Sequence, residues 1–103
     1  MDKITRIREY LAANPGDSFL QHALALELIK KGEDGEAQTV FENLLRADES
    51  YVGSYYHLAK LLERNQREQE AIAVYEKGMQ KAKEAGDQHA YNELRTAYED
   101  LTF

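Results

Sequence analysis

The chain has 103 residues, no cysteine and a formal charge of −6 at neutral pH. It is long enough for one domain, and the lack of cysteine excludes disulfides, thiolate zinc sites and cysteine nucleophiles. The acidic balance argues against nucleic-acid binding, and because no apolar run reaches the ~20 residues that span a bilayer, we expect no membrane segment and a cytoplasmic protein.

Apolar residues recur at helical spacing along the whole chain, which predicts an all-α fold with about six helices. The expected helices cover residues 2–13, 19–31, 34–47, 52–64, 68–84 and a last stretch from residue 88 to the C-terminus. The sequence "NPGD" at residues 14–17 separates the first two helices.

Cap residues predict where these helices begin and end. Ser18 and Gln21 have the spacing of a capping box, and Ser50 and Asp87 are candidate N-caps for later helices. At the other ends, Gly32, Asn65 and Gly86 are expected to stop their helices, since glycine and asparagine tolerate a left-handed backbone.

The sequence repeats itself at a fixed shift. Residues 18–51 align without a gap on residues 52–85, with seven identical pairs: Leu24/Leu58, Ala25/Ala59, Leu28/Leu62, Glu36/Glu70, Ala37/Ala71, Val40/Val74 and Glu42/Glu76. A repeat of this length is typical of stacked helical hairpins.

The repeated residues resemble the tetratricopeptide repeat, in which a large residue, a leucine, a small residue and a large residue are followed by an alanine and an aromatic residue. The matching positions are Leu24, Ala25, Leu28, Ala37 and Phe41 in one unit and Tyr55, Leu58, Ala59, Leu62, Ala71 and Tyr75 in the next. Leu44 and Gly78 depart from the pattern, because an alanine is usual there. The resemblance implies a right-handed superhelix of antiparallel helical hairpins.

The resemblance also predicts the domain organisation. The chain is expected to form a single domain with a half repeat at 2–16, repeats at 18–51 and 52–85, and a C-terminal capping helix at 87–103. The half repeat is inferred because Ile7 and Leu11 lie one repeat length before Phe41 and Leu45. The last helix is interpreted as a solvating cap, because Arg95 falls where a repeat needs a small residue.

In this family the first helices of the hairpins line a concave face that binds extended peptides or partner helices. The resemblance therefore implies a protein-interaction module that is not an enzyme and has no cofactor. The residues expected to contact the partner lie on the outer arcs of the three first helices: Phe19, His22, Leu26 and Ile29; Tyr56, Lys60 and Glu63; and His89 and Asn92, with Thr96 and Glu99 on the same arc. Only Lys60 and Asn92 offer the chemistry of a carboxylate clamp, so such a clamp is not predicted.

The apolar arc within residues 19–29 leaves three interpretations open. It is a groove for a protein or peptide, a surface through which the chain forms a homo-oligomer, or a repeat edge covered by the opening helix. A metal-dependent enzyme is a residual alternative, because His22, His57 and His89 fall one on each first helix. They lack the paired spacing of metal ligands, so no metal site and no catalytic residue are predicted.

Overall fold

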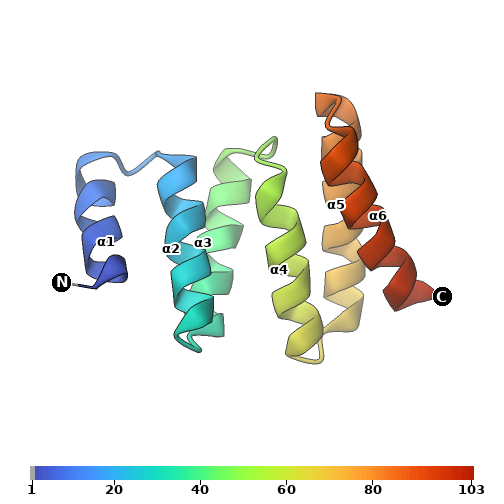
Figure 1. Cartoon of the computed structure of the whole chain (residues 1–103), viewed down its shortest axis with the longest axis horizontal. Coiled ribbons are helices and arrows are strands. Elements are labelled where there is room, and N and C mark those ends of the chain that lie inside the picture. Colours follow the sequence, from blue (N-terminus) through green and yellow to red (C-terminus); the bar gives the residue numbers. More distant parts are fainter. Residues whose placement is uncertain (1) are drawn as a thin grey trace. The chain divides into compact units, whose positions relative to one another are not determined.

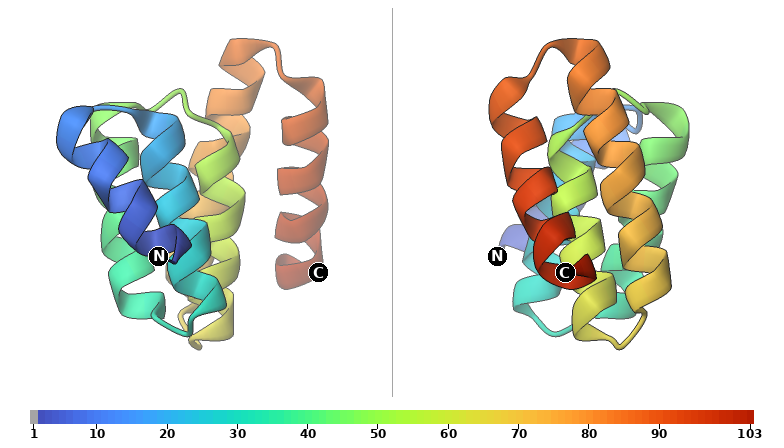
Figure 2. Two further views of the ribbon diagram at one scale, coloured as in Figure 1. Left: turned by 60° about the vertical axis from the view of Figure 1, so that its left-hand side comes forward. Right: turned by 90° about the vertical axis from the view of Figure 1, so that its right-hand side faces the viewer.

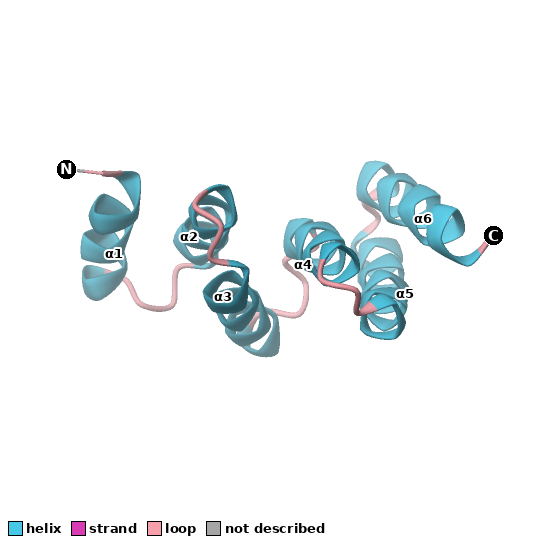
Figure 3. Cartoon of the chain, turned by 90° about the horizontal axis from the view of Figure 1, so that it is seen from below, coloured by secondary structure: helices cyan, strands magenta, loops and turns pink. Residues whose placement is uncertain are grey.

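The computed structural model describes residues 2–103, which form six helices and no strand (Figure 1, Figure 3). The helices are α1 (Lys3–Ala13), α2 (Ser18–Lys30), α3 (Asp34–Ala47), α4 (Gly53–Arg64), α5 (Glu68–Ala85) and α6 (Gln88–Thr102). The predicted all-α fold class is confirmed.

The chain divides into two compact units between Asp48 and Glu49. In the first unit, α2 packs against both α1 and α3. In the second unit, α5 packs against α4 and α6, and α4 also touches α6 (Figure 2). The assignment of a half repeat, two repeats and a cap to residue ranges stays a prediction.

The repeated residues form the cores of the two hairpins. The buried residues are Leu24, Ala25, Leu28, Ala37 and Phe41 in the α2–α3 hairpin and Leu58, Ala59, Leu62, Ala71 and Tyr75 in the α4–α5 hairpin. All four alanines are completely inaccessible to solvent. Their small side chains allow the paired helices to approach closely, while the aromatic residue one turn further along fills the remaining volume.

The two hairpin turns use the same backbone hydrogen bonds. The Glu33 amide donates to the Leu28 carbonyl at 2.8 Å, and the Arg67 amide donates to the Leu62 carbonyl at 2.9 Å. The same two carbonyls also accept from the Lys31 and Asn65 amides at 3.2 Å, so each turn is tied to the last turn of its helix by two bonds to one carbonyl. The equivalent bonds lie one repeat length apart, so the period of the sequence is also the period of the turn geometry.

The residues with a left-handed backbone in the turns between helices correct the prediction that Asn65 adopts this conformation. Gly32 and Gly86 adopt positive φ angles of 85° and 70°, as expected. Asn65 ends α4 as its C-cap, as predicted, but its φ is −99°, and Gln66 takes the left-handed conformation with φ 64°. Gln66 lies one repeat length after Gly32, so the hydrogen bonding of the turn selects the residue, although asparagine has the better intrinsic tolerance.

The start of α2 corrects a second prediction. The N-cap is Asp17, whose carboxylate accepts from the Leu20 amide at 3.0 Å. The helix therefore begins at Ser18, one residue before the predicted start, and the capping box of Ser18 and Gln21 does not form. The Ser18 hydroxyl instead donates to the Asp48 carboxylate at 2.8 Å.

Of the two N-caps predicted for later helices, the one for α4 is wrong and the one for α6 is confirmed. Ser50 is not the N-cap residue of α4, because this helix begins at Gly53 and Val52 occupies the N-cap position. Asp87 caps α6 as predicted, because its carboxylate accepts from the Ala90 amide at 3.0 Å.

Gly78 is a point of close contact between helices in the second unit. A Cβ atom placed on Gly78 would lie 2.7 Å from the Cβ of Tyr55 on α4 and 3.2 Å from Cδ1 of Leu94 on α6. Tyr55 has little freedom to move, since it is buried and its hydroxyl donates to the Glu49 carbonyl at 2.7 Å. The lack of a side chain at Gly78 therefore lets α5 pack against both neighbours.

We expect Gly78→Ala to lower the free energy of unfolding by about 1 kcal/mol. Overpacking costs ~1–3 kcal/mol, and the better helix propensity of alanine offsets up to ~1 kcal/mol of that. Gly35→Ala is the matched control, because Gly35 also lies in a helix and has nothing within 4 Å of its Cβ position. It should stabilise the chain by up to ~1 kcal/mol. Urea denaturation measures both, and stabilisation by both variants would contradict the close contact.

We expect Ala59→Leu to cost about 1–3 kcal/mol of stability, because Ala59 is fully buried in the α4–α5 hairpin and has no room for a larger side chain. Ala73→Leu on the exposed side of α5 should change stability by less than about 0.5 kcal/mol. Thermal melts followed by circular dichroism compare the two. Equal losses at both positions would count against the packing role of the repeated alanines.

Candidate functional site

An open groove of about 370 Å³ runs between α4 and α6 in the second unit. Its lining consists of Tyr56 and Lys60 from α4 and His89, Asn92, Glu93, Thr96, Ala97 and Asp100 from α6. Tyr56, Lys60, His89 and Asn92 were predicted as partner-binding residues from two separate helices, and the structure brings them together in this one groove.

The α4 wall of the groove carries the Tyr56 ring and Lys60, whose ammonium group already contacts other side chains of α4. Nζ of Lys60 lies 3.6 Å from Oε2 of Glu63 and 5.7 Å from the centre of the Tyr56 ring. The Tyr56 ring in turn meets the His57 ring edge-on, with centroids 5.5 Å apart. The lysine is thus held by a carboxylate and by the face of an aromatic ring, both on its own helix.

Glu63 was predicted to contact the partner but does not line the groove. Its carboxylate accepts a hydrogen bond from the Tyr75 hydroxyl of α5, in addition to its contact with Lys60. Burial of Tyr75 and the nearby Glu63 carboxylate raise the pKa of the Tyr75 phenol, so it remains a neutral donor at physiological pH. Glu63 therefore orients Lys60 from beside the groove.

The α6 wall is a polar stripe with two carboxylates. Nε2 of His89 lies 3.7 Å from Oε2 of Glu93, a contact that is an ion pair only when the imidazole is protonated. The side-chain oxygen of Asn92 accepts from Gln88 at 2.8 Å. Asp100 continues the stripe two helical turns beyond Glu93.

Three residues that line the groove were not predicted from the sequence as lying on the outer arcs, namely Glu93, Ala97 and Asp100. The helical spacing contained the signal, because positions 89, 93, 96 and 100 share one face of an α-helix. The predicted arc ended at Glu99 instead, whose carboxylate pairs with Arg95 at 3.0 Å.

The other predicted partner-binding residues lie on α2 of the first unit. Phe19 is 68% exposed, whereas His22, Leu26 and Ile29 are half-buried. The His22 ring packs edge-on against the Phe41 ring of α3, with centroids 5.8 Å apart. The arc is therefore only partly accessible, and its role in binding stays a prediction.

The surroundings of the histidines bear on the residual alternative of a metal-dependent enzyme. Burial lowers the pKa of His57, and the negative charge of Glu93 opposes this effect. Within residues 2–103, no three side chains of His, Asp or Glu are placed to hold a metal ion.

The six helices of residues 2–103 were also compared with the requirements of a membrane span. None of them combines the length and the apolar character that crossing a bilayer requires.

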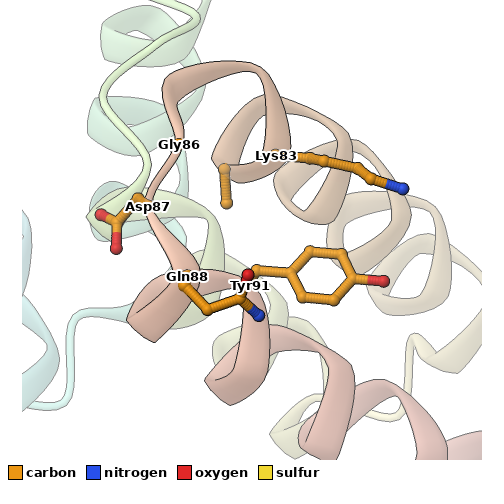
Figure 4. A pocket seen from close by; sticks show the side chains of 6 residues that line it. Lys83, Gly86, Asp87, Gln88 and Tyr91 are labelled. Atoms are coloured by element: carbon orange, nitrogen blue, oxygen red, sulfur yellow. The ribbon is translucent and has the colours of Figure 1, made fainter.

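A second, smaller cavity of about 210 Å³ lies at the α5–α6 turn. Figure 4 shows the Lys83 side chain and the Tyr91 ring extending in the same direction, with the Asp87 carboxylate turned away. Asp87 serves as the N-cap of α6. None of these residues was predicted as a site.

Comparisons with known proteins give one matching family and several similar structures. The family model "Tetratricopeptide repeat" matches residues 52–84. A tetratricopeptide repeat domain protein from Salinibacter ruber is 41% identical to this chain, and the match covers 84% of this chain. Its crystal structure matches over 96% of its own length with a TM-score of 0.80. Its solution structure matches over 88% of its own length with a TM-score of 0.81. No curated protein sequence matches significantly.

A solution structure from Bordetella parapertussis has a TM-score of 0.85 over 99% of this chain and 89% of that chain, but the identity is 22% and the likeness concerns the fold alone. The Salinibacter protein is similar in sequence as well as in fold. Together with the matched repeat and the two buried sets of repeat residues, this likeness shows that the chain belongs to the tetratricopeptide repeat family.

Proposed function

We propose that this chain is a non-enzymatic protein-interaction module that binds a peptide segment of a partner in the groove between α4 and α6. The observation that carries the proposal is the convergence of Tyr56, Lys60, His89 and Asn92 on one groove. Helical repeat proteins commonly bind partners through extended surfaces, which supports a binding role in general.

The size and chemistry of the groove favour a peptide over a small metabolite. Its volume of about 370 Å³ is at the low end for small-molecule pockets, and most of its α6 side chains are exposed to solvent. A peptide would contact it as a strip along the surface. Asn92 and Thr96 offer hydrogen bonds to a peptide backbone, while the Tyr56 ring offers apolar surface.

We expect Thr96→Arg to abolish partner binding without unfolding the chain. Thr96 is exposed and lines the groove, so a long side chain there occupies the volume of the peptide at no cost to the core. Ala73→Arg adds the same charge on the exposed side of α5 and should leave binding unchanged. Affinity capture from the native lysate, quantified by mass spectrometry, compares both variants with the original chain. Equal capture by all three proteins would refute the proposed groove.

Self-association through the α2 arc is the second candidate, favoured by the 68% exposure of Phe19. We expect Leu26→Asp to convert an oligomer into a monomer under this alternative, because a carboxylate would be buried at the interface. Light scattering at micromolar concentration measures the mass, and circular dichroism checks that the helices remain. A monomeric original chain, or an unchanged mass in the variant, would eliminate this candidate. Unfolding of the variant would assign Leu26 to the core and support the interpretation of the arc as a covered edge.

A further inference from the structure

We infer that the groove between α4 and α6 selects a basic peptide segment, whose lysine or arginine side chains pair with Glu93 and Asp100. This selectivity rests on the proposed function and adds the chemistry of the partner. The ligand is an extended peptide with two cationic residues three positions apart.

The lysine that lines the groove already contacts a carboxylate of its own helix. Lys60 lies 3.6 Å from the Glu63 carboxylate and over the Tyr56 ring. Glu63 is itself fixed by the hydroxyl of buried Tyr75, so it cannot easily leave the lysine. An acidic peptide would have to compete with Glu63 for the ammonium group, which weakens the attraction of the groove for anions.

The carboxylates of the groove, by contrast, are available to a ligand. Glu93 is more than half exposed, and its carboxylate contacts His89, which is charged only when protonated, and also acts on His57 through its negative charge. The ion pairs found among residues 2–103 do not include Asp100. The groove thus contains two carboxylates, from Glu93 and Asp100, and one ammonium group that already contacts Glu63. This distribution of charge is complementary to a cationic partner.

The spacing of the two carboxylates matches an extended peptide. Glu93 and Asp100 are seven residues apart on α6, which places them on one face and ~10 Å apart along the helix axis. A polyproline II segment rises ~3.1 Å per residue with three residues per turn, so side chains at positions i and i+3 share a face and lie ~9 Å apart. A pattern of Lys or Arg, two other residues, and Lys or Arg matches this spacing.

The wall opposite these carboxylates suits the same ligand. Lysine and arginine have apolar stems that pack on aromatic surfaces while their charged ends reach a carboxylate. On that wall, the ring of Tyr56 from α4 provides apolar surface within the groove. The basic side chain is thereby accommodated along its length.

The test measures binding of three labelled decapeptides to the full chain by fluorescence anisotropy. One peptide carries two lysines at positions i and i+3 among alanine and glutamine, the second has the same composition with adjacent lysines, and the third has glutamates in place of the spaced lysines. We expect the spaced basic peptide to bind at least about threefold more tightly than the adjacent one, and the acidic peptide to bind weakest.

Two double variants separate groove contacts from net charge. Glu93→Gln with Asp100→Asn should weaken the spaced basic peptide by about fivefold, as expected for the loss of two exposed ion pairs. Glu9→Gln with Glu68→Gln removes the same charge from exposed positions outside the groove and should change affinity by less than about twofold. Equal losses in the two double variants would overturn the inference.

The outcomes also distinguish this inference from the proposed function. Failure of the spaced basic peptide to bind, or tighter binding of the acidic peptide, overturns the basic selectivity, while the capture experiment with Thr96→Arg still decides whether the groove binds a partner. If Thr96→Arg captures the same proteins as the original chain, both the proposed function and this inference fall.

Discussion

The close approach of paired helices at small residues is the constraint on which the rest of the structure depends. Ala25, Ala37, Ala59 and Ala71 have no solvent-accessible surface, and Gly78 leaves no room for even one additional carbon atom beside Tyr55. When helices are this close, each can adopt only a narrow range of rotations about its axis. The rotation of α4 in turn determines that Tyr56 and Lys60 border the same groove as the outer residues of α6.

Most of the fold could be predicted because this constraint is encoded in residue type. An alanine followed one turn later by an aromatic residue, repeated at the same place in the next unit, identifies both hairpins and their cores without knowledge of distant contacts. The exact ends of the helices were harder to predict, because more than one residue near each end can serve as the cap. Asp17 displaced Ser18 as N-cap, and Gln66 became left-handed in place of Asn65, since hydrogen bonds of the whole turn outweighed the preference of a single residue.

The candidate site was predictable to the extent that it depends on helical spacing. Tyr56, Lys60, His89 and Asn92 follow from the outer faces of their helices. Spacing alone could not choose between Glu99 and Asp100, because the choice depends on the rotation of α6. It also could not show that Glu63 turns toward α5, since this depends on a hydroxyl group supplied by Tyr75.

The pair Phe41 and Tyr75 shows how a core position affects the chemistry of a surface. Both rings are completely buried at equivalent positions of the repeat, and they differ by one oxygen atom. In the first unit, the Phe41 ring packs against the His22 ring. In the second unit, the Tyr75 hydroxyl donates a hydrogen bond to the Glu63 carboxylate. This carboxylate also pairs with the Lys60 ammonium group. A buried phenol needs a hydrogen-bond partner, so a carboxylate at its end is drawn from the surface toward the core. Because Lys60 contacts Glu63, the exposed carboxylates that line the groove are those of α6. Under the proposed function, the buried Tyr75 hydroxyl thereby bears on the charge of the peptide that the groove would select.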